Sequence, residues 1–400
     1  MTGALAVAGV ALGVVAVLLA VPSTVFFVEC VASLFRPRAP RFDPTAPRPS
    51  AAVLMPAHDE AAVLAETLRA LAPELGEDDR VLVVADNCSD ATAEIARAEG
   101  AGVTERTDAE RRGKGYAIVH GVAHLAAAPP DVVVIVDADC RLSLGALDQL
   151  AREAAHTGRP TQAVYLFGTG SDSALAAVSA LALVVRNLVR PLGLHRLGLP
   201  CHLAGSGMAF PFGVLRDAPE TGSFLAEDQL MGLQLAAAGR APWFLPTAQV
   251  RSELPPDRGD ALGQRRRWEH GFLTMLFRYG PASLARGIAR RDRDLIATSL
   301  DLCVPPLALL VATLVALAVL GAALVGLGGS AAPLVVTAAA LALVGVAVLL
   351  AWARHARAFV PFRTLVAAPF YVLWKIPLYL AFFLGRGQKT WQRTKRKEER

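Results

Sequence analysis

The feature that most constrains this chain is a run without any charged side chain, from Leu302 to Ala353. Glycines and a serine at residues 326–330, followed by Pro333, divide the run into two apolar halves. A helix needs about 20 mostly apolar residues to cross the hydrocarbon core of a bilayer. Each half is long enough, and only helices and closed barrels satisfy their backbone groups in lipid. We therefore predict a transmembrane hairpin over residues 302–353.

A second apolar run, from Ala4 to Phe27, predicts an uncleaved transmembrane helix near the N-terminus. A cleaved signal peptide is the alternative, but such a peptide begins with basic residues, and no Lys or Arg precedes Arg36. Basic residues are enriched on the cytoplasmic side of membrane proteins. They follow this helix, flank the hairpin and fill the tail: Arg36, Arg38 and Arg41; Arg290, Arg291 and Arg293; Arg354 and Arg357; and Lys389–Arg400. We expect an extracytoplasmic N-terminus and a cytoplasmic C-terminus.

Two other apolar segments are predicted not to span the bilayer. Ala174–Val189 is short and ends at arginines, which favours a helix within the soluble domain, at the membrane surface. Thr364–Leu384 is interrupted by Pro369, Lys375 and Pro377 and carries aromatic residues, a composition that suits an interfacial or re-entrant helix. A spanning segment there would put the basic tail outside.

The chain is 54% hydrophobic and 19% charged, and its apolar excess lies at the two ends, which leaves a soluble domain between them. The net charge of +5 is concentrated beside apolar stretches, which favours membrane flanks over nucleic-acid binding. Five cysteines without metal-ligand spacing indicate no disulfide scaffold. The predicted division is an N-terminal transmembrane helix (1–35), a Pro-rich cytoplasmic linker (36–49), the soluble domain (50–280), an interfacial connector (281–301), the transmembrane hairpin (302–353), and an interfacial or re-entrant helix with a basic cytoplasmic tail (354–400).

Within the soluble domain, short apolar runs alternate with helical patterns. The runs at 51–56, 80–85 and 131–136 indicate buried strands. Helices are predicted at 61–71, 91–98, 114–127 and 144–155. The alternation predicts an α/β domain with a parallel sheet covered on both faces. Ligands of such sheets bind beyond the carboxyl ends of the strands.

Polar residues stand at the ends of these elements. Asp137 and Asp139 follow the third strand, and two carboxylates so placed can reach one divalent cation and its phosphates. A solvated Asp pair is the alternative, which a preceding buried strand weakens. Asp86 can accept hydrogen bonds from a base or ribose, although a helix cap is also consistent with its position. Lys114 between two glycines suits a phosphate contact, with a solvated turn lysine as the alternative.

Farther along the chain, Asp228 stands at the start of an apolar helix. It can act as a general base, and capping of that helix is the alternative. Arg267 can neutralise a leaving diphosphate, and Trp268 can stack on a sugar ring; a solvated basic helix end is the alternative for both.

The motifs P-A-H-D-E, D-N-C-S-D, G-K-G, D-A-D, G-S-G, E-D and Q-R-R-R-W occur in this order between residues 56 and 268. The ordered set resembles family 2 of the inverting glycosyltransferases, most closely the membrane-embedded branch of cellulose, hyaluronan, chitin and poly-N-acetylglucosamine synthases. The resemblance covers about residues 50–280. It implies an α/β GT-A (Rossmann-like) catalytic domain beside α-helical transmembrane segments.

The resemblance also implies roles for individual residues. The donor would be bound by His58, Glu60, Asp86, Lys114, Asp137 and Arg267, and the acceptor by Trp268, Gly205 and Ser206. Asp139, with Asp137, would hold a divalent cation, Mg²⁺ or Mn²⁺, and Asp228 would be the catalytic base. Ala226 departs from the family pattern, which often has Thr or another polar residue there.

The activity so implied is a metal-dependent hexosyl transfer from a nucleotide-diphosphate sugar to a hydroxyl of a glycan or lipid-linked acceptor, with inversion to β-linkages in polysaccharide synthesis. A single-addition transferase that glycosylates a membrane lipid is the alternative, since about three spanning helices are fewer than large synthases use. A nucleotidyltransferase with the same type of sheet is a further alternative. Asp228 and the Arg267–Trp268 pair argue against it, because they would have no obvious role in that reaction. Expected partners are the bilayer of the cell membrane and accessory export subunits or a second copy of the chain, but no nucleic acid. Because nucleotide sugars are cytoplasmic, the catalytic domain is expected there too.

Overall fold

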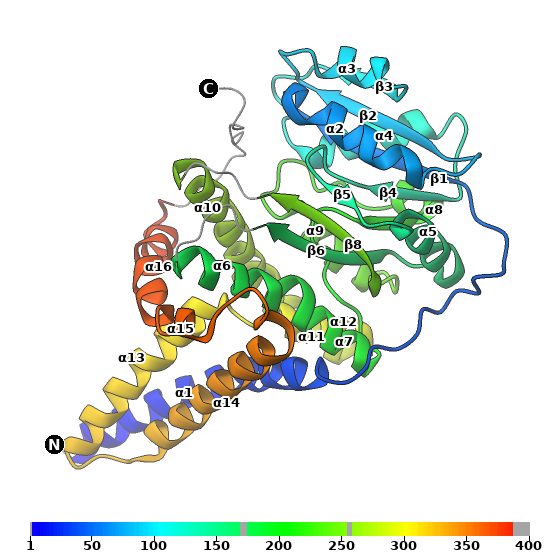
Figure 1. Ribbon diagram of the computed structural model, residues 1–400. Helices are drawn as coiled ribbons and strands as arrows, with labels where there is room; N and C mark the ends of the chain where they lie inside the picture. The colour runs from blue at the N-terminus through cyan, green and yellow to red at the C-terminus, as the bar shows by residue number, and fades with distance from the viewer. Residues whose placement is uncertain (1, 169–173, 254–257, 387–400) are drawn as a thin grey trace.

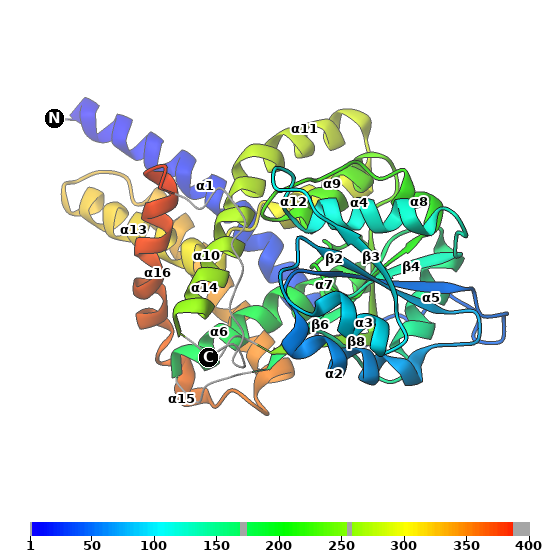
Figure 2. The same ribbon diagram turned by 90° about the horizontal axis from the view of Figure 1, so that it is seen from above.

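The computed structural model describes residues 2–168, 174–253 and 258–386. It has a sheet domain and a group of long helices that project from it (Figures 1 and 2). The projecting helices are α1 (Thr2–Ala32), α13 (Leu307–Gly326) and α14 (Ala332–Ala351). Helices α13 and α14 form the predicted hairpin, with its turn at residues 327–331.

One sheet of eight strands carries the domain, in the order β3-β2-β1-β4-β7-β6-β8-β5. The strands are β1 (Ala51–Ala57), β2 (Arg80–Asp86), β3 (Gly102–Arg106), β4 (Val132–Ile135), β5 (Arg141–Leu142), β6 (Thr161–Gly168), β7 (Met208–Pro211) and β8 (Trp243–Glu253). Strands β3, β2, β1 and β4 are parallel, as predicted. The sheet as a whole is mixed, because β7 runs antiparallel to β4 and β6, and β5 antiparallel to β8. Strand β7 is reached from α7 through an irregular stretch, residues 198–207.

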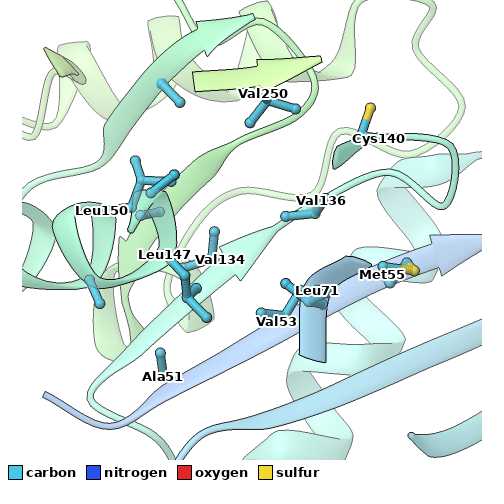
Figure 3. Close-up of a cluster of buried hydrophobic side chains, with 14 of the residues drawn as sticks. Ala51, Val53, Met55, Leu71, Val134, Val136, Cys140, Leu147, Leu150 and Val250 are labelled. Carbon is cyan, nitrogen blue, oxygen red and sulfur yellow. The ribbon is translucent and has the colours of Figure 1, made fainter. Parts of the chain in front are cut away.

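Helices cover both faces of this sheet. They are α2 (Ala61–Leu71), η1 (Ala72–Glu74), α3 (Thr92–Ala98), α4 (Lys114–Leu125), α5 (Ala146–Thr157), α8 (Phe212–Arg216) and α9 (Glu227–Ala237). The four helices predicted between residues 61 and 155 are thus confirmed, to within two residues at each boundary. On one face, Leu147 and Leu150 of α5 pack with Val53 and Val134 of the sheet (Figure 3). On the other face, Ile118 of α4 belongs to a second apolar core.

The remaining helices connect the sheet domain to the projecting helices. They are α6 (Ala174–Val184), the π-helical turn η2 (Val185–Val189), α7 (Arg190–Leu197), α10 (Arg258–Thr274), η3 (Met275–Tyr279), α11 (Gly280–Arg290), α12 (Arg293–Leu302), η4 (Trp352–Ala356), α15 (Phe362–Leu365) and α16 (Ala368–Phe383).

Among the described residues, four helices are long and apolar enough to cross a membrane: Gly3–Ala32, Ala176–Leu197, Leu307–Gly326 and Ala332–Ala356. The second differs from the others. In its most apolar stretch 61% of the residues are buried inside the protein, against 11% in the N-terminal helix. This burial supports its predicted place within the catalytic part. Helix α16 has 16 residues, about 24 Å, which is shorter than the hydrocarbon core. The basic tail beyond residue 386 lies outside the described residues.

The predicted linker, residues 36–49, is fixed along the sheet domain. The backbone amides of Arg41 and Phe42 donate to Glu153 at 2.8 and 3.3 Å. The Arg41 guanidinium lies 3.7 Å from the centre of the Trp243 ring. These contacts bind the linker to the sheet domain.

Helix α1 also approaches α7 closely. A side chain at Gly193 of α7 has no room, because its Cβ would lie 2.0 Å from the backbone carbonyl oxygen of Glu29. The close approach brings Arg190 of α7 to Glu29, with Nε 2.7 Å from Oε2. Arg190 also donates to the backbone carbonyl of Asp301 in α12 at 2.7 Å and pairs with that side chain.

We expect Gly193→Ala to loosen this junction, because a methyl group cannot fit without separating two backbones. The loss in unfolding free energy should be about 1–3 kcal/mol. The midpoint of thermal unfolding in detergent measures it. Gly345→Ala is the matched control, since no atom lies within 4 Å of the Cβ that it would add in α14. Equal midpoints for the two variants would contradict the close contact between α1 and α7.

Candidate active site

A cavity of about 490 Å³ lies at the carboxyl edge of the parallel strands β1, β2 and β4. It is lined by most of the residues predicted from the sequence: His58, Glu60, Asp86, Lys114, Asp137, Asp139, Gly205, Asp228, Arg267 and Trp268. Most of these side chains gather at the edge of the sheet because they follow a strand or begin a helix packed on it, whereas Arg267 and Trp268 come from within α10.

Two loops with unusual backbone form one end of the cavity. Asp59 and Asn87, which follow β1 and β2, both have φ of +53°. Non-glycine residues seldom adopt this left-handed conformation, and such strain concentrates at functional sites. The loops are tied together, since His58 Nδ1 lies 2.6 Å from the Asp86 carbonyl and the Ser89 amide donates to Asp59 at 2.6 Å.

Asp86 ends β2 and is held by a residue that the sequence analysis missed. Arg106, the last residue of β3, donates to Asp86 Oδ1 at 2.6 Å. The Arg106 guanidinium also lies 5.4 Å from the centre of the Tyr116 ring. The short strand β3 carries no apolar run, so nothing in the local pattern indicated this pairing.

Lys114 is built into the acidic side of the cavity. Its ammonium pairs with Asp137 and donates to the Gly205 carbonyl at 2.7 Å. Burial alone would lower the pKa of Lys114, but Asp137, Glu227 and Asp228 outweigh it and raise the pKa. The flanking glycine Gly115 has a packing role, because a Cβ there would lie 2.6 Å from the Gly222 carbonyl oxygen.

Asp137 and Asp139 offer a cation site. Their carboxylates and the Cys140 thiol lie within 4.8 Å of one another. Burial and the charge of Asp139 raise the pKa of Cys140, so the thiol stays protonated and is a poor ligand. Lys114 already engages Asp137, whereas Asp139 Oδ2 accepts a hydrogen bond from Ser252 at 3.1 Å. The two carboxylates fit a hard divalent cation.

Glu227 and Asp228 begin α9 and face the same space. Burial and the Asp228 charge raise the pKa of Glu227 to about 7. Burial also raises the pKa of Asp228, against the lowering effect of Arg186. A carboxylate with a raised pKa is the stronger base, which suits proton removal near neutral pH. Arg186 was missed as a site residue because it looked like the polar end of an apolar helix.

The Q-R-R-R-W run lies on α10, where each residue turns about 100° from the last. Gln264, Arg267 and Trp268 face the cavity. Trp268 lies 5.3 Å from Phe167, between ring centres, which completes an aromatic wall. Arg266 points elsewhere and donates to the Arg386 carbonyl at 2.7 Å.

The structure corrects the placement of Ser206, which is fully buried behind the cavity wall. Its hydroxyl accepts a hydrogen bond from the Asp137 amide at 3.1 Å, so it positions the acidic loop and cannot reach an acceptor. Gly205 does line the cavity, with φ of +92°. A Cβ at Gly205 would project toward Asp228, 3.6 Å from its Oδ2.

The fold of the chain is similar to that of solved structures. The chain is similar to the mannosyltransferase PcManGT from Pyrobaculum calidifontis, in complex with GDP-Man and Mn²⁺, at 19% identity and a TM-score of 0.54 over 94% of this chain and 99% of that one. It is also similar to the glucosyl-3-phosphoglycerate synthase of Mycobacterium tuberculosis in complex with Mn²⁺, UDP and phosphoglyceric acid, at 20% identity and a TM-score of 0.37 over 59% and 86%. At these identities the first likeness shows a shared fold, and the second carries no argument.

No curated protein sequence matches the chain. The profile of the family described as "Glycosyltransferase like family 2", however, matches residues 47–271, more than half of the chain and nearly all of the sheet domain. The chain belongs to the family 2 glycosyltransferases, with a GT-A-like domain beside helices long enough to cross a membrane.

Proposed function

We propose that the protein transfers a sugar, with inversion, from a nucleoside-diphosphate sugar to an acceptor hydroxyl at a membrane. One observation supports this most: a single cavity joins the carboxylates of Asp139 and Asp228 to the Arg267–Trp268 pair. Asp139 offers a cation site and Asp228 offers a base. Arg267 supplies positive charge, and Trp268 supplies a surface on which a sugar can stack. These are the parts that a direct displacement needs.

Each residue then has a task. His58, Glu60 and Asp86 hold the nucleoside at the loop end of the cavity, and Lys114 keeps Asp137 oriented. A divalent cation held by Asp139 and Asp137 neutralises the diphosphate when bound. Arg267 adds positive charge to the leaving group.

Asp228 takes the proton of the acceptor hydroxyl as its oxygen attacks the anomeric carbon. The bond from that carbon to the diphosphate breaks on the opposite face, so an α-linked donor gives a β-glycoside. One displacement needs no nucleophile from the protein. The Q-R-R-R-W run favours extension of a glycan in polysaccharide synthesis, and addition of one sugar to a lipid-linked acceptor uses the same groups.

We also propose that α1, α13 and α14 cross the cell membrane, with the sheet domain in the cytoplasm. The outward sides of these helices are apolar and bare, as at Val10 of α1, Val319 of α13 and Val335 of α14. The turn after α13 carries no Lys or Arg, whereas basic residues flank the hairpin at its other end.

Asp228→Asn should abolish transfer while leaving the fold and donor binding intact, because the amide cannot take a proton. The rate should fall on the order of 10²–10⁴-fold. Release of nucleoside diphosphate from a panel of nucleotide sugars measures it. Asp217→Asn is the control, since Asp217 is exposed and outside the cavity lining. Turnover of Asp228→Asn at the rate of the unaltered protein would rule out Asp228 as the base.

Activity should be lost in EDTA and restored by Mn²⁺ or Mg²⁺. Asp139→Asn should raise the cation concentration for half-maximal activity by at least roughly 10- to 100-fold, the loss known even for outer-shell partners of metals. Asp137→Asn should raise it less, because Lys114 already engages that carboxylate. Titration of each variant with the cation measures the concentration for half-maximal activity. Full activity in the presence of the chelator would show that transfer does not need a metal ion.

Membrane orientation can be read by cysteine labelling in intact cells, on a background without the native cysteines. A cysteine at Ser330, exposed in the turn of the hairpin, should react with an impermeant reagent. One at Gln388, beyond the described residues, should react only after permeabilisation. Labelling at position 388 in intact cells would show that α16 crosses as a fourth span.

A further inference from the structure

A second cavity, of about 110 Å³, lies beside the catalytic one. The two share Leu183, Arg186 and Trp268 in their linings, so one wall separates them. The smaller cavity is less than a quarter of the larger and cannot hold a second sugar nucleotide.

Two half-buried arginines of this cavity have no ion pair within 4 Å among the described residues. The Arg186 guanidinium lies 5.8 Å from the ring centre of Phe272, and that of Arg265 lies 6.0 Å from that of Trp374. The charge of Arg186 acts on Asp228 and Glu269 from farther away. A half-buried guanidinium is stabilised by an anion, and its planar fork matches phosphate.

The other basic groups of the cavity are already neutralised. Arg190 is held by Glu29 and Asp301. Lys375 of α16 pairs with Glu269, which also accepts a hydrogen bond from Tyr379 at 3.2 Å. Arg186 and Arg265 are therefore the arginines of this cavity that have no carboxylate within ion-pair distance among the described residues.

The opposite side of the cavity is apolar and belongs to the projecting helices. Phe26 of α1 and Leu307 of α13 contribute to it. Helix α13 begins there, with Pro306 before its first residue and no side-chain cap, so its first amides and its dipole add positive potential. Apolar helix surfaces continue from this point to residues such as Val10 and Val319.

We propose that this second cavity binds the phosphate of a membrane lipid that carries the acceptor sugar. The phosphate lies between Arg186 and Arg265, the lipid chain follows α1 and α13, and the sugar rests on Trp268 with a hydroxyl toward Asp228. The inference rests on the proposed function and names its acceptor: a sugar linked through phosphate to a lipid. The transfer is the displacement already described, with the hydroxyl proton passing to Asp228 and the nucleoside diphosphate leaving.

Binding of a long-chain polyprenyl phosphate to the full chain in detergent tests the proposal without knowledge of the sugar. The dissociation constant should be at least tenfold lower than for the uncharged polyprenol of the same length. Inorganic phosphate should bind far more weakly than the lipid phosphate. Equal binding of lipid phosphate and polyprenol overturns the proposal, and equal binding of lipid phosphate and inorganic phosphate overturns the assignment to a lipid.

Variants locate the site. Arg265→Gln should weaken binding of the polyprenyl phosphate at least tenfold, and Arg265→Lys should weaken it less, because the charge remains. Arg278→Gln is the matched control: Arg278 is exposed on η3, lies 5.6 Å from the ring centre of Tyr279, and lines neither cavity. Unchanged lipid binding in Arg265→Gln also overturns the proposal.

Binding of nucleoside diphosphates in Mn²⁺, measured on the same samples, separates this inference from the proposed function. Asp139→Asn should lose nucleotide and keep the lipid phosphate. If the protein binds nucleotide but does not prefer lipid phosphate to the uncharged polyprenol, the proposed transferase function is retained and the proposed acceptor is wrong. Lipid-phosphate binding without any nucleotide binding removes the proposed function instead.

Discussion

The structure depends on the pairing of Arg190 with Glu29 and Asp301, which joins α7 to the N-terminal helix and to α12. Burying an arginine is costly unless carboxylates compensate it, and removing one partner of such a group typically costs about 3–5 kcal/mol. Burial would raise the pKa of Asp301, but Arg190 and His202 outweigh it and hold the pKa below its usual value. The pairing of Arg190 with Asp301 is therefore stable in its charged form. The contacts of Arg190 fix helix α1 to the chain segment that also carries Arg186 of the cavity wall.

The junction at Arg190 places the projecting helices beside the sheet domain, so the active site has two sides. The donor side is made by the ends of β1, β2 and β4, and its geometry is set by the parallel sheet. The proposed acceptor side is made by η2 and α10, which pack on the projecting helices, whereas α16 lines only the smaller cavity. A ligand in the catalytic cavity would thus touch both the sheet domain and elements that pack on the projecting helices. We infer that anchoring serves catalysis by keeping these two sides in register.

The donor side could be predicted from the sequence because its signals are local. Buried strands such as 51–56 are continuous apolar runs, and the polar residues that follow them must gather at one edge of a parallel sheet. The antiparallel strand β7 could not be predicted, since its direction depends on contacts with β4 and β6, far away in the chain. Arg106 and Arg186 were missed for the same reason: each is defined by a partner or a cavity that only the folded chain brings near. Ser206 was predicted to bind the acceptor, and its burial behind Asp137 could not be foreseen because it depends on packing between distant segments.

The helix α10 shows how one short run serves both sides. Successive residues turn by about 100°, so adjacent arginines cannot share one environment. Arg267 faces the catalytic cavity, Arg265 faces the smaller one, and Trp268 lines both. The tryptophan ring is braced by Phe167 of β6, which ties its position to the sheet. An acceptor sugar stacked there would lie between a charge for the leaving diphosphate and a charge for its own lipid phosphate. Arg265 and Arg267 would then form two separate anion sites, with the Trp268 ring between them. Their positions along α10 determine that Arg267 faces the diphosphate and Arg265 faces the lipid phosphate.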